Sequence, residues 1–180
     1  MKASQSSRLV IDASIARASG GADAVHPTAA TVRDFLQQVL IICHRAVMTP
    51  AIRGEWDRHE SSFARKWRRS MVAKRKLIIL DLPERCDLRT AVDQGSASRN
   101  EKSAMIKDLL LVEAAIATDE RIIALDDKVK TLFGAESREI PELRTIIWIN
   151  PVTNPAGTLA LLKGEASLRQ WTLAAMSKDI

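Results

Sequence analysis

KDLLLVEAAIATDERIIALDD, residues 107–127, decides the fold, because it joins an apolar helix to a buried strand and places an acid in each. Asp108 opens the predicted helix, which ends near Thr118, and the apolar run 121–125 predicts a strand. Asp126 and Asp127 follow that strand directly. Carboxylates at strand exits in α/β proteins tend to point into the crevice where ligands bind. The stretch therefore predicts an α/β fold with a ligand site at one edge of its sheet.

Similar strands recur along the chain. We predict them at residues 8–12, 46–48, 76–80 and 144–149, and the first of them, RLVID, ends in Asp12. In the first half of the chain we predict helices from residue 28 or 31 to 44 and from 50 to about 74 with a break, and a short helix or loop from 83 to 93. A helix of about 15 residues is expected to end near 118, and a shorter one to run from 126 to 133 with Gly134 as its stop. After the last strand we predict one or two helices over 156–176, with a break near Gly164.

Strands that alternate with helices imply a central parallel sheet covered by helices. Right-handed crossovers bring the exits of parallel strands to one edge, so Asp12 and Asp126 should lie on the same rim. We therefore expect a three-layer α/β/α sandwich in residues 1–150. Residues 151–180 are expected to form a C-terminal helical extension that packs on this domain or on a partner.

Bulk composition points to a cytoplasmic protein without a membrane segment. Hydrophobic residues make up 46% of the 180 residues, and apolar runs such as 39–43 are far shorter than the roughly 20 residues that cross a bilayer. The first residues, MKASQSS, lack the apolar core of a signal peptide. Cys43 and Cys86 show no metal-binding spacing, and we expect them to be free, buried thiols, with a disulfide as the lesser alternative.

Asp12, Glu55, Asp108 and Asp126 are the four acids we single out as a candidate metal site. Several carboxylates together suit a hard divalent cation, because Mg²⁺ and Mn²⁺ prefer oxygen ligands. Each acid also has a simpler reading: Asp12 and Asp126 as helix caps, and Asp108 as an acid favoured by a helix N-terminus. Asp127 is the alternative to Asp126.

Glu55 shares its helix with two other acids. Asp57 lies four residues after Arg53, which predicts a surface ion pair, whereas Glu55 lies on a different face. Glu113 is five residues after Asp108, about 140° around the helix, so it is expected to be structural. Trp56, Phe63 and Trp67 follow a helical spacing and are expected to pack in the core or an interface rather than stack on bases.

Positive charge is concentrated in the first half of the chain. Residues 1–90 hold 16 Lys and Arg against 9 Asp and Glu, whereas residues 91–180 hold 11 against 13. A basic cluster of this kind attracts polyanions by neutralising phosphates, although a solvated helix face is the alternative. The cluster consists of Arg65, Lys66, Arg68, Arg69, Lys74, Arg75 and Lys76.

The chain resembles the PIN domain family over residues 8–150. The resemblance rests on RLVIDASI (8–15), TPAIRGEW (49–56) and above all on KDLLLVEAAIATDERIIALDD, which is similar to the family's third and fourth motifs. It implies an α/β/α sandwich with an acidic cluster that binds Mg²⁺ or Mn²⁺, in which Asp12, Glu55, Asp108 and Asp126 match the four family acids in order. Family members are commonly metal-dependent ribonucleases, and many are toxins of toxin–antitoxin pairs.

Three features depart from the family pattern. Ala124 stands where the family often has Ser or Thr, so a supporting hydrogen bond is lost unless Ser14 supplies a polar group. The segment 82–100 is long, and residues 151–180 extend beyond the compact toxins. The last two features bear on the toxin assignment more than on the fold.

These patterns lead to one functional hypothesis and one alternative. The hypothesis is that the protein is a Mg²⁺- or Mn²⁺-dependent endoribonuclease, which is a hydrolase. The backbone of its RNA substrate would be positioned by Arg53, Arg65, Lys66, Arg68 and Arg69. No histidine or Gly-rich loop offers another chemistry. The candidate partners are RNA, an antitoxin protein and a second copy of the chain. The alternative is a non-catalytic nucleic-acid-binding or regulatory protein on the same fold.

Overall fold

Five strands form one sheet in which every pairing is parallel. The computed structural model describes residues 6–21 and 23–176. The strand order is β3-β2-β1-β4-β5, so β1 is central, and its Val10 lies beside Val47 and Ile122 of its two neighbours. The strands are β1 (Arg8–Ile11), β2 (Arg45–Met48), β3 (Leu77–Ile79), β4 (Arg121–Ile123) and β5 (Ile147–Ile149).

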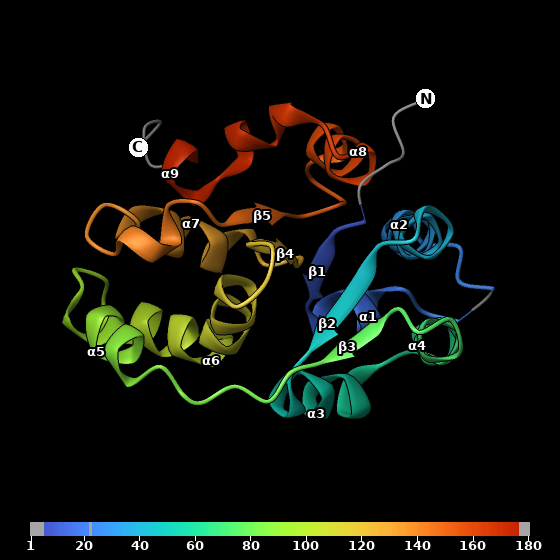
Figure 1. Cartoon of the computed structure of the whole chain (residues 1–180), viewed down its shortest axis with the longest axis horizontal. Coiled ribbons are helices and arrows are strands. Elements are labelled where there is room, and N and C mark those ends of the chain that lie inside the picture. Colours follow the sequence, from blue (N-terminus) through green and yellow to red (C-terminus); the bar gives the residue numbers. More distant parts are fainter. Residues whose placement is uncertain (1–5, 22, 177–180) are drawn as a thin grey trace.

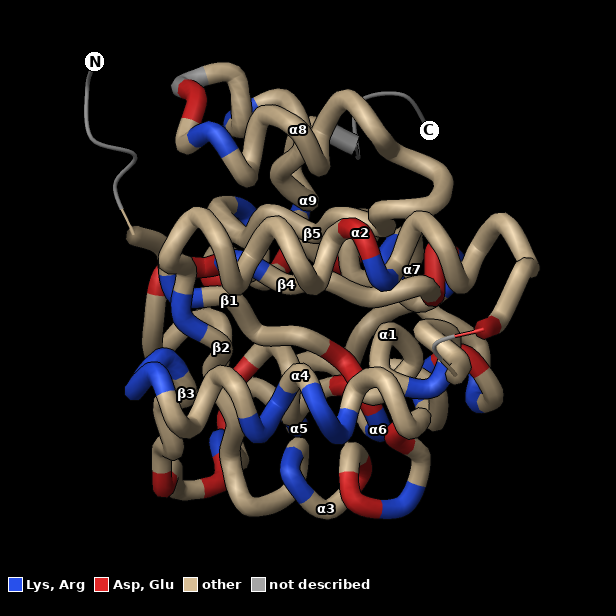
Figure 2. The backbone as a smooth tube through the Cα atoms, turned by 90° about the vertical axis from the view of Figure 1, so that its right-hand side faces the viewer, with Lys and Arg blue, Asp and Glu red and all other residues tan. Residues whose placement is uncertain are grey.

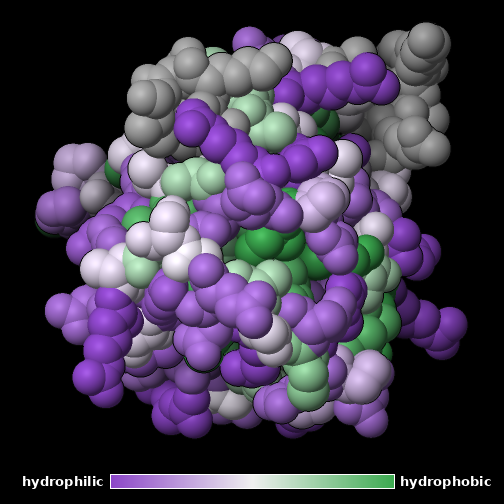
Figure 3. All heavy atoms as spheres, turned by 90° about the vertical axis from the view of Figure 1, so that its left-hand side faces the viewer, coloured by the Kyte–Doolittle hydropathy of each residue, from purple (hydrophilic) through white to green (hydrophobic). Residues whose placement is uncertain are grey.

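Helices cover both faces of this sheet, which confirms the three-layer sandwich (Figure 1). One layer contains α1 (Ala13–Ala18), α2 (Pro27–Ile42), α3 (Pro50–His59) and α4 (Ser62–Ala73). The other contains α5 (Cys86–Gln94), α6 (Arg99–Ile116) and α7 (Asp127–Glu136). The surface on the side of α5 and α7 is mostly hydrophilic, with small scattered apolar areas (Figure 3).

The break between α3 and α4 follows from local capping. The Thr49 hydroxyl accepts a hydrogen bond from the N–H of Ile52 (3.2 Å) at the start of α3, where Pro50 occupies the first turn. The Ser61 hydroxyl accepts one from the N–H of Ala64 (3.1 Å) and begins α4. The expected long helix with a break is therefore two helices separated by residues 60–61.

Two buried tryptophans pack α3 against α4, and one of them ties α3 to the sheet. Trp56 and Trp67 stack with ring centroids 5.8 Å apart. The Trp56 indole donates to the carbonyl of Ile11 (2.9 Å), the last residue of β1. These two aromatic residues of the helical stripe thus belong to the core, as expected, and Trp56 holds α3 close to the end of the central strand.

Three sequence-based expectations are wrong. Asp108 does not open its helix: it is the tenth of the 18 residues of α6, which begins after a capping box formed by Ser98 and Glu101. Gly134 does not end α7, since it is a buried residue inside a helix that runs to Glu136. The two cysteines are free as expected but exposed, because one caps the end of α2 and the other begins α5.

The chain after β5 returns to the sheet and adds to its edge. It forms α8 (Pro155–Lys163), the 3₁₀ helix η2 (Ala166–Trp171) and α9 (Leu173–Met176), and Gly164 ends α8 with φ +66°. Ile147 of β5 makes an antiparallel bridge with Thr172, and Leu173 N–H donates to the carbonyl of Ile146 (2.8 Å). Residues 177–180 of the predicted extension lie outside the described residues.

The remaining short element is η1 (Pro141–Leu143), a 3₁₀ helix that precedes β5. Among the described residues, no helix has both the length and the apolar character needed to span a membrane.

Candidate active site

The candidate site lies at the topological switch point of the sheet, between β1 and β4, where the strand order reverses. From β1 the chain adds β2 and then β3 on one side, and later adds β4 and β5 on the other. Ligands of open α/β sheets bind at such a switch point, beyond the carboxyl ends of the strands. Asp12 directly follows β1, and Asp126 follows β4 by three residues. The backbone N–H of Asp12 donates to the carbonyl of Ile123 (2.9 Å), so the two strand ends are joined at this point.

Asp12 and Asp126 each use one carboxylate oxygen to cap a helix. Asp12 Oδ2 accepts from the N–H of Ser14 (3.0 Å) at the start of α1. Asp126 Oδ1 accepts from the N–H of Val129 (2.9 Å) at the start of α7. These bonds fix the orientation of both carboxylates and leave the second oxygen of each available. The caps and a ligand site are therefore compatible readings of the same residues.

Asp108 approaches the same rim from α6 and is strongly perturbed. Burial and, after it, the negative charges of Asp12, Asp126 and Glu55 together raise the pKa of this half-buried carboxyl to about 7, against Lys107, which lowers it. A carboxyl whose pKa is raised by neighbouring carboxylates lies close to them in a poorly solvated place. The four predicted acids are thus brought into one electrostatic cluster.

Glu55 is the member of this cluster that has other partners. Its carboxylate forms an ion pair with Arg58 and lies 3.6 Å from Nε2 of His59, both on its own helix α3. A cation that recruited Glu55 would compete with these two contacts. Its neighbour Trp56 is held to the end of β1, which keeps Glu55 near the rim.

Asp127, the alternative to Asp126, and Glu113 both make structural contacts. Asp127 Oδ2 accepts hydrogen bonds from Asn150 Nδ2 (2.9 Å) and Thr153 Oγ1 (2.8 Å), and so ties α7 to the end of β5. Glu113 Oε1 accepts from the backbone N–H of Arg85 (3.1 Å), as expected of a structural residue. These contacts favour Asp126 over Asp127 as the fourth acid of the site.

Ser14 partly replaces the hydroxyl that is missing at position 124. Its Oγ accepts a hydrogen bond from the N–H of Leu125 (3.2 Å), in the turn that leads to Asp126. The polar contact thus comes from α1 instead of from the residue that follows β4.

The donor set fits a hard divalent cation in chemistry, because it offers carboxylate oxygens and excess negative charge. Asp12, Asp108 and Asp126 come from three separate elements, and Asp108 is only partly solvated. Within residues 6–21 and 23–176, however, no three His, Cys, Asp or Glu side chains already surround one point as a finished metal site. Holding a cation would therefore need side-chain rotation, foremost of Glu55.

A polar hollow of about 370 Å³ opens beside Asp108 and Asp126 and was not anticipated from the sequence. Asn100, Ser103 and Lys107 line it from one face of α6. Their spacing of three and four residues is the sequence signal for that face. It was missed because the helix was expected to start later, so only Asp108 of this face was considered.

Arg53, one of the predicted RNA contacts, lies on the opposite side of α3 from Glu55. Arg53 and Glu55 are two positions apart, which is roughly 200° around a helix. Viewed from the side of α2, α3 and α4, basic positions recur along α4 (Figure 2). On α3, therefore, the predicted basic contact and the acid of the candidate site occupy opposite sides of the helix.

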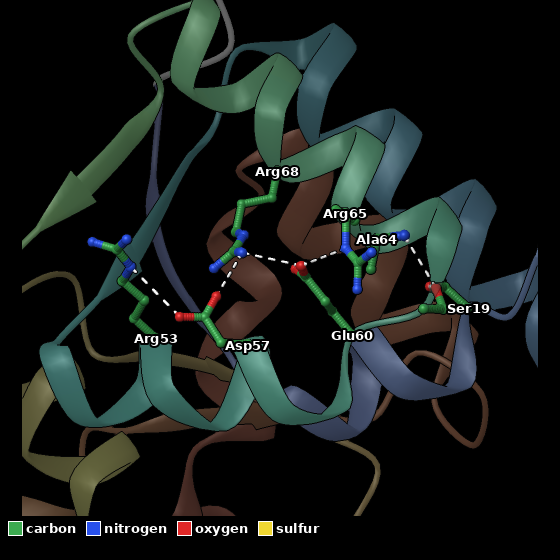
Figure 4. Close-up of polar contacts among 8 residues, drawn as sticks. Ser19, Arg53, Asp57, Glu60, Ala64, Arg65 and Arg68 are labelled. Carbon is green, nitrogen blue, oxygen red and sulfur yellow. Dashed lines mark hydrogen bonds and ion pairs between the residues drawn. The ribbon is translucent and has the colours of Figure 1, made fainter.

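Most of the predicted RNA-contacting arginines are already paired with carboxylates (Figure 4). Arg68 contacts both Asp57 (2.7 Å) and Glu60 (3.1 Å), and Arg65 contacts Glu60 (3.1 Å). The expected pair of Arg53 with Asp57 is present at 3.8 Å. Within the described part of the chain, Lys66 and Arg69 are the two of the five predicted RNA contacts that have no ion-pair partner.

In comparisons with family models, curated protein sequences and solved structures, the chain gives no significant match. Nothing in them bears on the resemblance to PIN domains, which rests on the motifs quoted above.

Proposed function

We propose that the chain is a divalent-metal-dependent endoribonuclease that acts through Asp12, Asp108 and Asp126, with Glu55 as an accessory ligand. The observation that carries the proposal is the placement of Asp108 beside Asp12, Asp126 and Glu55 at the switch point of the sheet, where its burial and their charges raise its pKa to about 7. Such clustering costs stability and is typical of functional sites. Asp12 and Asp126 support it because their caps orient them and leave one oxygen each.

In this proposal the protein supplies orientation and charge. Asp12, Asp108 and Asp126 would hold Mg²⁺ or Mn²⁺, which when bound supplies a water of lowered pKa and a positive charge beside the scissile phosphate. Lys107, in the hollow next to Asp108, is placed to hold a phosphate of the RNA backbone. RNA contacts remain a prediction for five basic residues: Arg53, Arg65, Lys66, Arg68 and Arg69. Of these five, Lys66 and Arg69 are the two without an ion-pair partner among the described residues.

The decisive test compares Asp→Asn variants, because asparagine keeps the helix caps at positions 12 and 126. Asp12→Asn, Asp108→Asn and Asp126→Asn are each expected to lower Mn²⁺-dependent cleavage of single-stranded RNA by about a hundredfold or more. Asp127→Asn and the exposed Asp34→Asn should keep most of the activity. The assay measures initial cleavage rates with Mn²⁺ and with EDTA, alongside thermal melting to verify folding. Undiminished cleavage by Asp12→Asn and Asp108→Asn would refute the assignment.

A second candidate is a non-catalytic nucleic-acid-binding or regulatory protein, favoured by the engagement of Glu55 with Arg58 and His59. A protein of this kind needs no cation. Calorimetric titration distinguishes the two: the nuclease is expected to bind Mn²⁺ at or below about 1 mM, with loss of binding in Asp108→Asn. Absence of binding together with absence of cleavage would favour the second candidate. Whether an antitoxin partner exists stays a prediction.

A further inference from the structure

We propose that a groove at the β3 edge of the sheet binds an extended segment of a partner protein in which acidic and aliphatic residues alternate. The groove has a volume of about 510 Å³. Its floor is apolar and consists of Val72, Ala73, Leu77 and Ile79, and its rim carries Arg53, Arg68 and Arg69. This proposal goes beyond the nuclease function and does not need the metal site, but it competes with the predicted RNA contacts for Arg53, Arg68 and Arg69.

Two residues on the floor of the groove expose aliphatic surface to solvent. Val72 of α4 is 57% exposed and Ile79 of β3 is 51% exposed. Leu77 and Ile79 are two positions apart, so their side chains leave the sheet on the same face. Neighbouring exposed aliphatic residues at the rim of a sheet mark a surface that gains by being covered.

The backbone of β3 offers hydrogen bonds beside that floor. Lys76 accepts a hydrogen bond from β2 and Leu80 donates one to it, both at 2.9 Å. In a parallel ladder alternate residues point their polar groups to the same side, so those of Leu77 and Ile79 point away from β2. Within the described part of the chain no strand pairs with this side of β3. An added strand would therefore find both backbone partners and apolar contacts.

The rim determines which kind of segment fits. Arg69 is exposed and has no ion-pair partner among the described residues, and Arg53 is only loosely paired, at 3.8 Å from Asp57. Arg68 is held in place by Asp57 and Glu60 and keeps the rim rigid (Figure 4). Positive charges around an apolar floor complement a strand with carboxylates on one face and aliphatic side chains on the other.

Two other occupants are disfavoured by the same residues. A second copy of the chain, paired edge to edge about a two-fold axis, would bring its own Arg53, Arg68 and Arg69 against these arginines. A nucleic acid would use the rim but would leave the aliphatic floor without a partner, because its backbone is charged. The acidic, aliphatic segment is the occupant that satisfies both rim and floor.

A peptide-binding experiment tests the proposal on the full chain in EDTA. The probe is a fluorescein-labelled peptide of about ten residues in which glutamate and valine alternate, and its counterpart contains lysine in place of glutamate. Fluorescence anisotropy is expected to show saturable binding of the glutamate peptide and at least about tenfold weaker binding of the lysine peptide.

Matched variants locate the binding surface. Arg69→Glu and Val72→Asp should each weaken binding of the glutamate peptide by about tenfold. Arg169→Glu makes the same charge change elsewhere, and Leu159→Asp introduces an acid at a site that is 52% exposed, so both should bind like the original protein. All four positions are at the surface, and circular dichroism verifies that each variant is folded.

Several outcomes would overturn the proposal. They are no binding of the glutamate peptide up to about 1 mM, equal binding of both peptides, or unchanged binding by Arg69→Glu and Val72→Asp. A dimer that Val72→Asp dissociates in light scattering would assign the groove to a second copy. Loss of single-stranded RNA binding in both variants would assign it to RNA.

Discussion

Asp108 shows how a single residue can be costly to the fold and useful to the site. Its carboxyl is half-buried and faces the charges of Asp12, Asp126 and Glu55, so its ionised form is disfavoured in the folded protein. In the unfolded chain the same group has an ordinary pKa near 3.8. The folded state therefore holds this proton more tightly than the unfolded state does.

The sign of the pH effect follows directly. The contribution of Asp108 to stability is fully present below pH 3.8 and is lost as the pH rises towards about 7. Asp108→Asn should therefore raise the free energy of unfolding at pH 8 by roughly 1–4 kcal/mol, and by little near pH 4. Urea unfolding in EDTA at both pH values measures this, with Asp34→Asn as the exposed control. Equal stability of Asp108→Asn and the original protein at pH 8 would contradict the prediction.

At this scale the sequence indicates which acids follow the buried strands but not how each side chain is held. Residues that follow buried strands, Asp12 and Asp126, are recognisable because the position after a parallel strand is fixed by topology. Asp108 was wrongly placed within its helix, since the helix begins at Arg99, nine residues before Asp108, after the cap formed by Ser98 and Glu101. The attachment of Glu55 to Arg58 and His59 depends on side-chain rotation, which a sequence pattern does not specify.

Two glycines, Gly95 and Gly54, differ in the space that surrounds them. Gly95, just after α5, leaves no room for a side chain, because an added Cβ would lie 2.5 Å from Oε2 of Glu136. Glu136 is buried, and its other oxygen accepts a hydrogen bond from the N–H of Ser96 (3.1 Å). Gly54, inside α3, has open space around that position.

Alanine substitutions at these positions should therefore have opposite effects. Gly95→Ala is expected to lower the free energy of unfolding by about 1–3 kcal/mol, because the Glu136 carboxylate must leave its buried partners. Gly54→Ala is expected to raise it by about 0.5–1 kcal/mol, because glycine is a poor residue in a helix interior. Urea unfolding of both variants is the measurement. The interpretation fails if Gly95→Ala is as stable as Gly54→Ala.

Element boundaries were predictable where a cap stands in the sequence. Thr49-Pro50 marks the start of α3, and Gly164 marks the end of α8 through its left-handed backbone. Gly134 misled because glycine is usual after a helix, whereas here it is buried within α7 beside Phe133. Close packing, which involves residues distant in sequence, determined its place.

At the scale of the whole molecule, His44 connects the segment before β1 with helix α8 near the C-terminus. Its ring is buried, Nδ1 accepts from the N–H of Ser7 (3.0 Å) and Nε2 lies 3.1 Å from the carbonyl of Leu162 in α8. Burial lowers the pKa of His44, and the charges of Arg121 and Lys76 lower it further, against the bond to Leu162. The neutral ring, with its proton on Nε2, satisfies both contacts.

Because the folded-state pKa is depressed, the stability that His44 contributes is present above pH 6.5 and is lost as the pH falls through the folded value. At pH 7.5, His44→Ala should have a free energy of unfolding lower by roughly 1–3 kcal/mol, because it removes the buried hydrogen bonds of the ring with Ser7 and Leu162. The difference in free energy of unfolding between His44→Ala and the original protein should become smaller towards pH 5. Urea unfolding across this range tests it, with the exposed His59→Ala as control. A difference that widens on acidification would contradict the assignment.

The fold class was accessible from the sequence because alternation of strands and helices leaves few architectures. The way residues after β5 return to the sheet was not, because it depends on contacts such as that between His44 and Leu162, 118 residues apart. No local pattern encodes such a contact.

The unequal edges of the sheet limit how the protein can polymerise. At β5 the segment around Thr172 already occupies positions next to Ile146 and Ile147, whereas β3 is open among the described residues. A molecule with one free sheet edge can pair with only one other copy through strand addition. Edge-to-edge assembly of copies therefore stops at a dimer. Deleting the chain from Thr172 onward would free a second edge and permit fibre growth.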